Sequence, residues 1–313
     1  MRKKNERVMM VSDLFSCFRA CITRKRQDGR DSTADLYRAA TNWLELFCEG
    51  KRLPLRRVTQ RFVMEFEAYL KSKGLKVNTV NTYLSNFRAM YNLVIDGSEE
   101  VKNCKPFAKL KIKQQATAKR ALSREVMEEI AGLKLDDRPE LEMAADLSLF
   151  SFMACGMAFV DLVHLKPENI REGEIIYNRR KTGTEIRIGM TEGMKIILDK
   201  YKQEDTPFLF PLLKEENASY ETYKSLLRCQ NEALKEIGQF LISPIQLTTY
   251  RFRHTWASEA LLCGIPIAVI SQALGHTSEN TTRIYLKQLN QSVMNEANSM
   301  ITKSVGDLLV KVA

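Results

Sequence analysis

Two of the chain's three histidines lie within a 23-residue window that is crowded with other polar side chains. They are His254 and His276, and Arg251, Arg253 and Tyr285 accompany them. Such crowding around consecutive helix ends indicates a site rather than an ordinary surface. Arg253 offers a planar fork that matches a phosphate group. Tyr285 carries a hydroxyl of pKa about 10, so as a nucleophile it needs neighbouring cations or must lose its proton during attack.

Three consecutive helices are predicted to position this window. The first covers residues 250–262 and ends at Cys263-Gly264, and the second covers residues 266–275, between a proline and a glycine. Thr277-Ser278 can cap the third helix, which contains Tyr285.

A predicted β-hairpin interrupts the helices of the same domain. Residues 173–189 hold two short β-rich runs on either side of a Lys-Thr-Gly-Thr turn. Arg179, Arg180 and Lys181 lie at its tip, which makes the tip strongly basic.

The charge is divided unevenly along the 313 residues. Residues 1–120 hold 26 basic and 12 acidic side chains, and the remainder holds 22 basic and 26 acidic ones, within a formal net charge of +10. This imbalance predicts that the first segment faces a polyanion, and nucleic acid fits because basic positions alternate with helical apolar ones. A solvated basic surface is the alternative that composition leaves open.

Residues 10–95 predict several amphipathic helices, with caps in the 31–35 stretch, at Thr59 and at Asn78-Thr79. Basic side chains on their exposed faces suit phosphate contact. They are Arg57, Arg61, Lys76 and Arg88.

Residues 101–124 contain eight basic residues and no acidic one, without helical periodicity. We expect an extended linker here, because its self-repulsion would be relieved along a phosphate backbone. Its DNA-contact candidates are Lys109, Lys111, Lys113, Lys119 and Arg120. Ser123 is predicted to cap the first helix of the next domain. The predicted organisation is a helical domain over 1–107, a linker over 108–121, a second domain over 122–302 and a tail over 303–313.

Composition excludes several classes of protein. No apolar run approaches the roughly 20 residues that span a bilayer, and no N-terminal apolar stretch predicts a signal peptide. The seven cysteines have no metal-ligand spacing, which predicts buried thiols in a reducing cytoplasm and no metal site.

Three linked motifs carry a resemblance to a known family. Arg253-His254-Thr255, Leu274-Gly275-His276 and Tyr285, nine residues beyond that histidine, resemble the tyrosine recombinases, or phage integrase family. Residues 155–162 resemble its first catalytic box, and Lys181 matches its hairpin lysine. The resemblance implies a mainly α fold, with a helical core-binding domain and a mostly helical catalytic domain that holds a small antiparallel hairpin or sheet.

The resemblance also implies the activity, that of a site-specific recombinase that cleaves and rejoins DNA through a 3′-phosphotyrosyl intermediate. Tyr285 would be the nucleophile, Arg253 would bind the phosphate, and Lys181 would protonate the leaving 5′-oxygen. His276 would hydrogen-bond the phosphate or share in the proton transfer. Because the ester bond energy is conserved, neither a cofactor nor a metal is expected. The expected partners are double-stranded DNA and further copies of the chain, forming a tetramer on DNA. Arg180 and Arg251 are expected to contact the DNA backbone.

Two positions depart from the family pattern. Ala158 stands where the first box has an arginine, and Tyr250 stands where a histidine or lysine is usual. In a subgroup found on Bacteroides-type mobile elements, which the chain resembles, an arginine at the position of Arg179 is thought to substitute. Two alternatives stay open, a DNA-binding relative without catalysis and a type IB topoisomerase. The sequence predicts neither the target site nor the choice among integration, excision and inversion.

Overall fold

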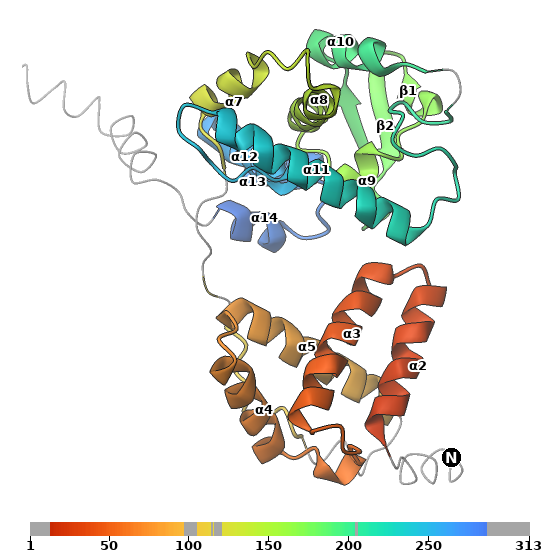
Figure 1. Cartoon of the computed structure of the whole chain (residues 1–313), viewed down its shortest axis with the longest axis vertical. Helices are drawn as coiled ribbons and strands as arrows, with labels where there is room; N and C mark the ends of the chain where they lie inside the picture. The colour runs from red at the N-terminus through yellow and green to blue at the C-terminus, as the bar shows by residue number, and fades with distance from the viewer. Residues whose placement is uncertain (1–12, 97–104, 114, 116–120, 204–205, 287–313) are drawn as a thin grey trace, which may run out of the picture. The chain divides into compact units, whose positions relative to one another are not determined.

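The computed structural model describes residues 13–96, 105–113, 115, 121–203 and 206–286, and the chain divides into two compact units, Met1–Thr117 and Ala118–Ala313 (Figure 1). Both units are mainly helical, as predicted, and the second also holds a small antiparallel sheet. Within the described ranges, every helix is too short or too polar to span a bilayer. The linker over 108–121 and the tail over 303–313 remain predictions from the sequence. Residues 116–120 of the linker and the whole tail lie outside the described residues.

The first unit is built from α2 (Leu14–Gln27), α3 (Asp31–Phe47), the 3-10 helix η1 (Leu55–Arg57), α4 (Gln60–Ser72) and α5 (Val77–Ile95). Thr59 caps α4 as predicted, since its hydroxyl accepts from the Phe62 N–H at 3.2 Å. The predicted cap in the 31–35 stretch is wrong, because these residues lie inside α3. Two of its carboxylates accept instead from Arg26 of the preceding helix.

Helix α5 begins one residue earlier than predicted, at Val77, with Lys76 at the cap position. Asn78 does not cap it. Its side-chain amide exchanges two hydrogen bonds of 2.9 Å with the backbone of Gln115, and Asn81 donates to the Lys113 carbonyl at 2.8 Å. The backbones of Lys113 and Gln115 are therefore bound to α5.

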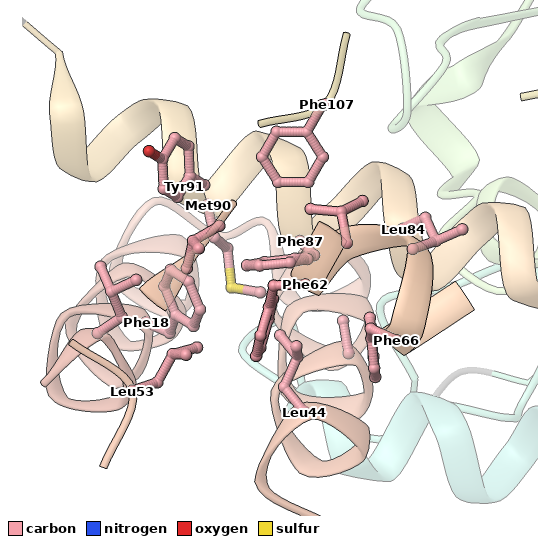
Figure 2. Packing of buried hydrophobic residues seen from close by; sticks show 14 of the residues in the cluster. Phe18, Leu44, Leu53, Phe62, Phe66, Leu84, Phe87, Met90, Tyr91 and Phe107 are labelled. Atoms are coloured by element: carbon pink, nitrogen blue, oxygen red, sulfur yellow. The ribbon is translucent and has the colours of Figure 1, made fainter. Parts of the chain in front are cut away.

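Aromatic rings fill the core of the first unit (Figure 2). Phe87 is fully buried, and its ring meets those of Phe18, Phe66 and Phe107 edge to face at centroid distances of 5.1–6.0 Å. Each such side chain contributes roughly 1.5–3 kcal/mol through burial and somewhat more through edge-to-face geometry. The unit thus has its own hydrophobic core.

The second unit places helix α8 between two hydrophobic clusters. Leu147 and Phe150 pack in one cluster, and Leu141 and Ala144 pack in the other. The helices of this unit are α7 (Arg124–Ala131), α8 (Pro139–Met153), α9 (Phe159–Leu162), η2 (Pro167–Asn169), α10 (Glu192–Tyr201), α11 (Tyr220–Phe240), α12 (Thr249–Leu262), α13 (Ile267–Ala273) and α14 (Glu279–Leu286). Ser123 caps α7 as predicted.

The sheet has the order β1 (Ile170–Arg171), β2 (Glu174–Asn178) and β3 (Glu185–Gly189), with both pairs antiparallel. The hairpin of β2 and β3 is the predicted one, whereas the two-residue β1 had no signal in the sequence. Ile175 opposite Ile188 and Tyr177 opposite Ile186 form one buried face. This alternation fixes the register and holds residues 179–184 at the end of the hairpin.

The six described cysteines are free thiols. The prediction that the cysteines are buried is wrong for Cys229, on α11, and for Cys263, at the end of α12, because both are exposed.

Candidate functional site

Arg253, on α12, is held by backbone carbonyls from two distant segments. Its guanidinium donates to the Gly156 carbonyl at 2.7 Å and to the Leu274 carbonyl, and the residue is 3% exposed. Gly156 has a φ of +67°, and a Cβ at this position would lie 2.9 Å from the Arg253 Cα. Glycine therefore allows the first-box loop to pack directly on the arginine.

Arg179 directly follows β2 and binds the residue after Leu274. It is 7% exposed, and its Nη1 donates to the Gly275 carbonyl at 2.8 Å, where the Thr182 hydroxyl also donates at 3.2 Å. Arg253 and Arg179 thus bind the carbonyls of consecutive residues, between α13 and α14. Two buried guanidinium groups are brought together in this way.

Asp161, on α9, is the acidic member of this cluster. Its Oδ1 accepts from the Arg180 backbone N–H at 2.8 Å, and its Oδ2 lies 3.9 Å from the Arg179 Nε. Burial raises the pKa of this carboxyl, while the Arg180 N–H and the Arg179 and Arg253 charges oppose that shift. Two buried cations facing one buried carboxylate leave an excess of positive charge, which favours a bound anion.

His276 stands next to this pair of arginines. Its Nε2 lies 3.4 Å from a guanidinium nitrogen of Arg253, and its Nδ1 lies 2.8 Å from the Thr282 hydroxyl on α14. Burial, and then the positive charges of Arg253, Arg179 and Lys181, lower the pKa of His276 to about 4. The imidazole is therefore neutral at physiological pH.

A pocket of about 420 Å³ opens beside Arg253. Its walls include both positions that depart from the family pattern, Ala158 and Tyr250, together with the aromatic side chains of Phe159 and Tyr223. Tyr250 is 41% exposed at the start of α12, and its ring meets that of His254 edge to face at 4.6 Å.

The remaining catalytic candidates are Lys181 and Tyr285. Lys181 is exposed in the hairpin turn, and its charge acts on His276. Tyr285 belongs to α14, but the side chains of residues 284–286 lie outside the described part of the chain. Thr182 and Thr282 also contact the site. The sequence gives them no role, because their types and spacing do not show which threonines are buried against it.

The predicted DNA-contact residues are mostly exposed. In the first unit, Arg57 lies in η1, where it stands over the Phe62 ring, and Arg61 pairs with Glu65. The others described as exposed are Lys76, Arg88, Lys109, Lys111, Lys113 and Arg180. Arg251 is half-buried on α12. Lys119 and Arg120 lie outside the described residues.

Comparison with known proteins adds an independent finding. Residues 13–112 match the phage integrase SAM-like domain, and residues 123–292 match the phage integrase family. The tyrosine recombinase XerA of Pyrococcus furiosus is 24% identical over 257 residues, which cover 80% of this chain and 82% of that protein.

Two solved structures share the fold. The Tn1549 transposon integrase in complex with transposon right end DNA has a TM-score of 0.63 at 14% identity, over 92% of this chain and 99% of that one. A lambda integrase tetramer bound to a Holliday junction has a TM-score of 0.57 at 16% identity, over 80% of this chain and 70% of that one.

Proposed function

The chain belongs to the phage integrase family and is a tyrosine-type site-specific recombinase, and we propose that it cleaves and rejoins duplex DNA through Tyr285. The observation that carries this proposal is the convergence of Arg253 and Arg179 on the turn at Leu274 and Gly275, beside a neutral His276. This cluster offers a scissile phosphate two planar donors and an excess of positive charge.

The reaction divides among few groups. The Tyr285 oxygen attacks the phosphorus, the bond to the 5′-oxygen breaks, and a 3′-phosphotyrosyl ester forms. Lys181 gives its proton to the departing 5′-oxygen. The unprotonated Nε2 of His276 accepts the phenolic proton of Tyr285. The negative charge of the phosphodiester offsets the Arg253, Arg179 and Lys181 charges that, together with burial, lower the pKa of this histidine. The reverse sequence restores the DNA without an external energy source.

Arg179 takes the place of the family's first-box arginine, whose position is occupied by Ala158 in this chain. Its burial and its hydrogen bond to the carbonyl next to the one that Arg253 uses support this assignment. The same substitution motivates assignment of the chain to the subgroup on Bacteroides-type mobile elements. Tyr250 contributes at most a hydrogen bond, because a phenol cannot replace a cation.

Double-stranded DNA is the proposed substrate, and a tetramer on two DNA sites is the proposed assembly. The structures of the Tn1549 integrase on transposon end DNA and of the lambda integrase tetramer on a Holliday junction support both by analogy. The tail over 303–313 is proposed to dock on a neighbouring protomer.

A nicked suicide duplex tests the chemistry, because loss of a short 5′-hydroxyl fragment traps the covalent adduct. Wild-type protein should form an adduct that maps to Tyr285 and should exchange strands, and Tyr285→Phe should form none. No wild-type adduct would indicate a binding protein without catalysis. Relaxation of supercoiled DNA without strand exchange would indicate a type IB topoisomerase.

A test of the role of Arg179 requires a variant that still folds. Arg179→Ala alone leaves the buried Asp161 without its cation, so the Arg179→Ala/Asp161→Asn double variant should recover stability but not cleavage. We expect a loss of about 100-fold or more in the cleavage rate, the scale of one lost transition-state donor. Arg171→Ala, at an exposed arginine of β1 that donates to the Glu168 carbonyl, is the matched control. Unchanged cleavage in the Arg179 variants, with none in Arg253→Ala, would disprove the assignment.

A further inference from the structure

Thr282 joins the helix of the proposed nucleophile to the site histidine. Its side chain is fully buried on α14, and its hydroxyl oxygen lies 2.8 Å from the His276 Nδ1. Tyr285 follows one turn later on the same helix. Helix α14 also packs against α12, which carries Arg253, and against α13. One hydrogen bond therefore connects two parts of the proposed machinery.

The surroundings of His276 define which ring nitrogen carries the proton. A guanidinium group can only donate, so the contact of 3.4 Å from Arg253 is favourable only when Nε2 is unprotonated. In a neutral imidazole the proton then resides on Nδ1, and the Thr282 hydroxyl oxygen accepts it. The low pKa of His276 agrees with a single proton on this ring.

We propose, on the basis of the function proposed above, that Thr282 is a positioning residue. Its hydroxyl holds His276 in the Nδ1–H tautomer and directs the unprotonated Nε2 toward the Arg253 guanidinium, where it is available to accept the Tyr285 phenolic proton. Because Thr282 belongs to α14, the histidine adopts this state only when the helix that carries Tyr285 is packed in place. Packing of α14 therefore both positions Tyr285 and fixes the tautomer of His276.

The tautomer is measurable without DNA. Long-range ¹H–¹⁵N spectra of the full chain, labelled with ¹⁵N-histidine, contain signals from only three histidines, and His276→Gln identifies those of His276. Wild-type protein at pH 7 should show the Nδ1–H form. The shape-matched Thr282→Val should show a large population of the Nε2–H form, whereas Thr282→Ser should retain the wild-type pattern. A wild-type Nε2–H form, or an unchanged spectrum in Thr282→Val, would overturn the proposal.

The consequence for the reaction is tested with the nicked duplex at saturating DNA. Thr282→Val should form adduct about 10- to 100-fold more slowly, the effect of removing a partner that orients a functional histidine, at unchanged DNA affinity. Thr282→Ser should restore the rate. Thr281→Val, one position earlier and exposed, is the matched control.

A normal adduct rate in Thr282→Val despite an altered tautomer, or an equal loss in Thr281→Val, would refute the positioning role. The spectra need no catalysis, so the two proposals fail separately. Wild-type protein with the Nδ1–H tautomer but no adduct would refute the proposed function and leave the histidine assignment in place.

Discussion

Gly156 is the residue on which the close packing of Arg253 depends. Its φ of +67° is rare for residues with a side chain, and an added Cβ would lie 2.9 Å from the Arg253 Cα, which is backbone and cannot rotate away. Gly173 has a similar φ of +79°, but a Cβ added there would have no neighbouring atom within 4 Å. An alanine at either position would have a strained backbone, but only an alanine at position 156 would also clash with Arg253.

This difference predicts unequal effects of alanine. Gly173→Ala should lower the free energy of unfolding by about 1–2 kcal/mol through left-handed backbone strain. Gly156→Ala should lower it by roughly 1–3 kcal/mol more through overpacking, and it should abolish adduct formation by displacing the guanidinium. Urea unfolding of both variants measures the difference. Equal losses would show that the Arg253 contact is unimportant for stability.

Residue identities were more predictable than residue partners. The types and spacing of Arg253, His276 and Tyr285 indicate phosphate chemistry from the sequence, and the described side chains of the first two do meet. The carbonyl that holds Arg179 lies 96 positions away along the chain, so only the fold brings the two together. Thr282 was missed because its role depends on burial and on a neighbouring ring.

Helix α5 illustrates how an element organises a neighbouring segment. Asn78 and Asn81 lie one turn apart and bind the backbones of Gln115 and Lys113 through three hydrogen bonds of 2.8–2.9 Å. This segment follows the exposed Lys109 and Lys111. The backbone of Lys113, one of the predicted DNA-contact residues before the domain boundary, is thus bound to α5.

Removal of the two amides should release the segment. Asn78→Ala/Asn81→Ala loses three hydrogen bonds worth about 0.5–1.5 kcal/mol each, so tryptic cleavage after Lys111 and Lys113 should accelerate by about tenfold or more. Asn86→Ala is the control, because the Asn86 amide donates only within α5. Equal cleavage of both proteins would mean that the amides do not restrain this segment.

Helix ends with a strong local sequence signal were predictable. A helix end was not predictable where another side chain competes for the capping residue. Thr59 and Ser123 cap their helices as their types and spacing indicate. Asp31 resembles a cap equally well, yet Arg26 engages its carboxylate and α3 begins at Asp31 itself. Strand β1 has two residues, too few for an alternating pattern.

At the scale of the whole molecule, charge and chemistry belong to different units. The excess of basic residues lies within residues 1–120, whereas the pocket and the paired arginines lie in the second unit. Each unit has its own hydrophobic core. Affinity for DNA and the rate of cleavage should therefore respond to separate substitutions.

The salt dependence of DNA affinity tests whether Lys109, Lys111 and Lys113 contact phosphates. In Lys109→Gln/Lys111→Gln/Lys113→Gln, the slope of log affinity against log salt should fall by about 0.9 for each phosphate that is no longer neutralised. The loss of affinity should be equal on duplexes with and without a recombination site, because phosphate contacts carry no sequence information. Lys51→Gln, where the lysine pairs with Glu49 at 2.7 Å, should change the slope little. An unchanged slope in the triple variant would exclude these lysines from DNA contact.

The carbonyls of Leu274 and Gly275 also determine when during biosynthesis the site can form. Translation proceeds toward the C-terminus, so a nascent chain extended only through α12 already contains Arg179 and Arg253 but not the two carbonyls that orient them. Their alignment must await the synthesis of residues 274 and 275. A polypeptide whose synthesis stops before residue 274 consequently cannot assemble this phosphate-binding arrangement.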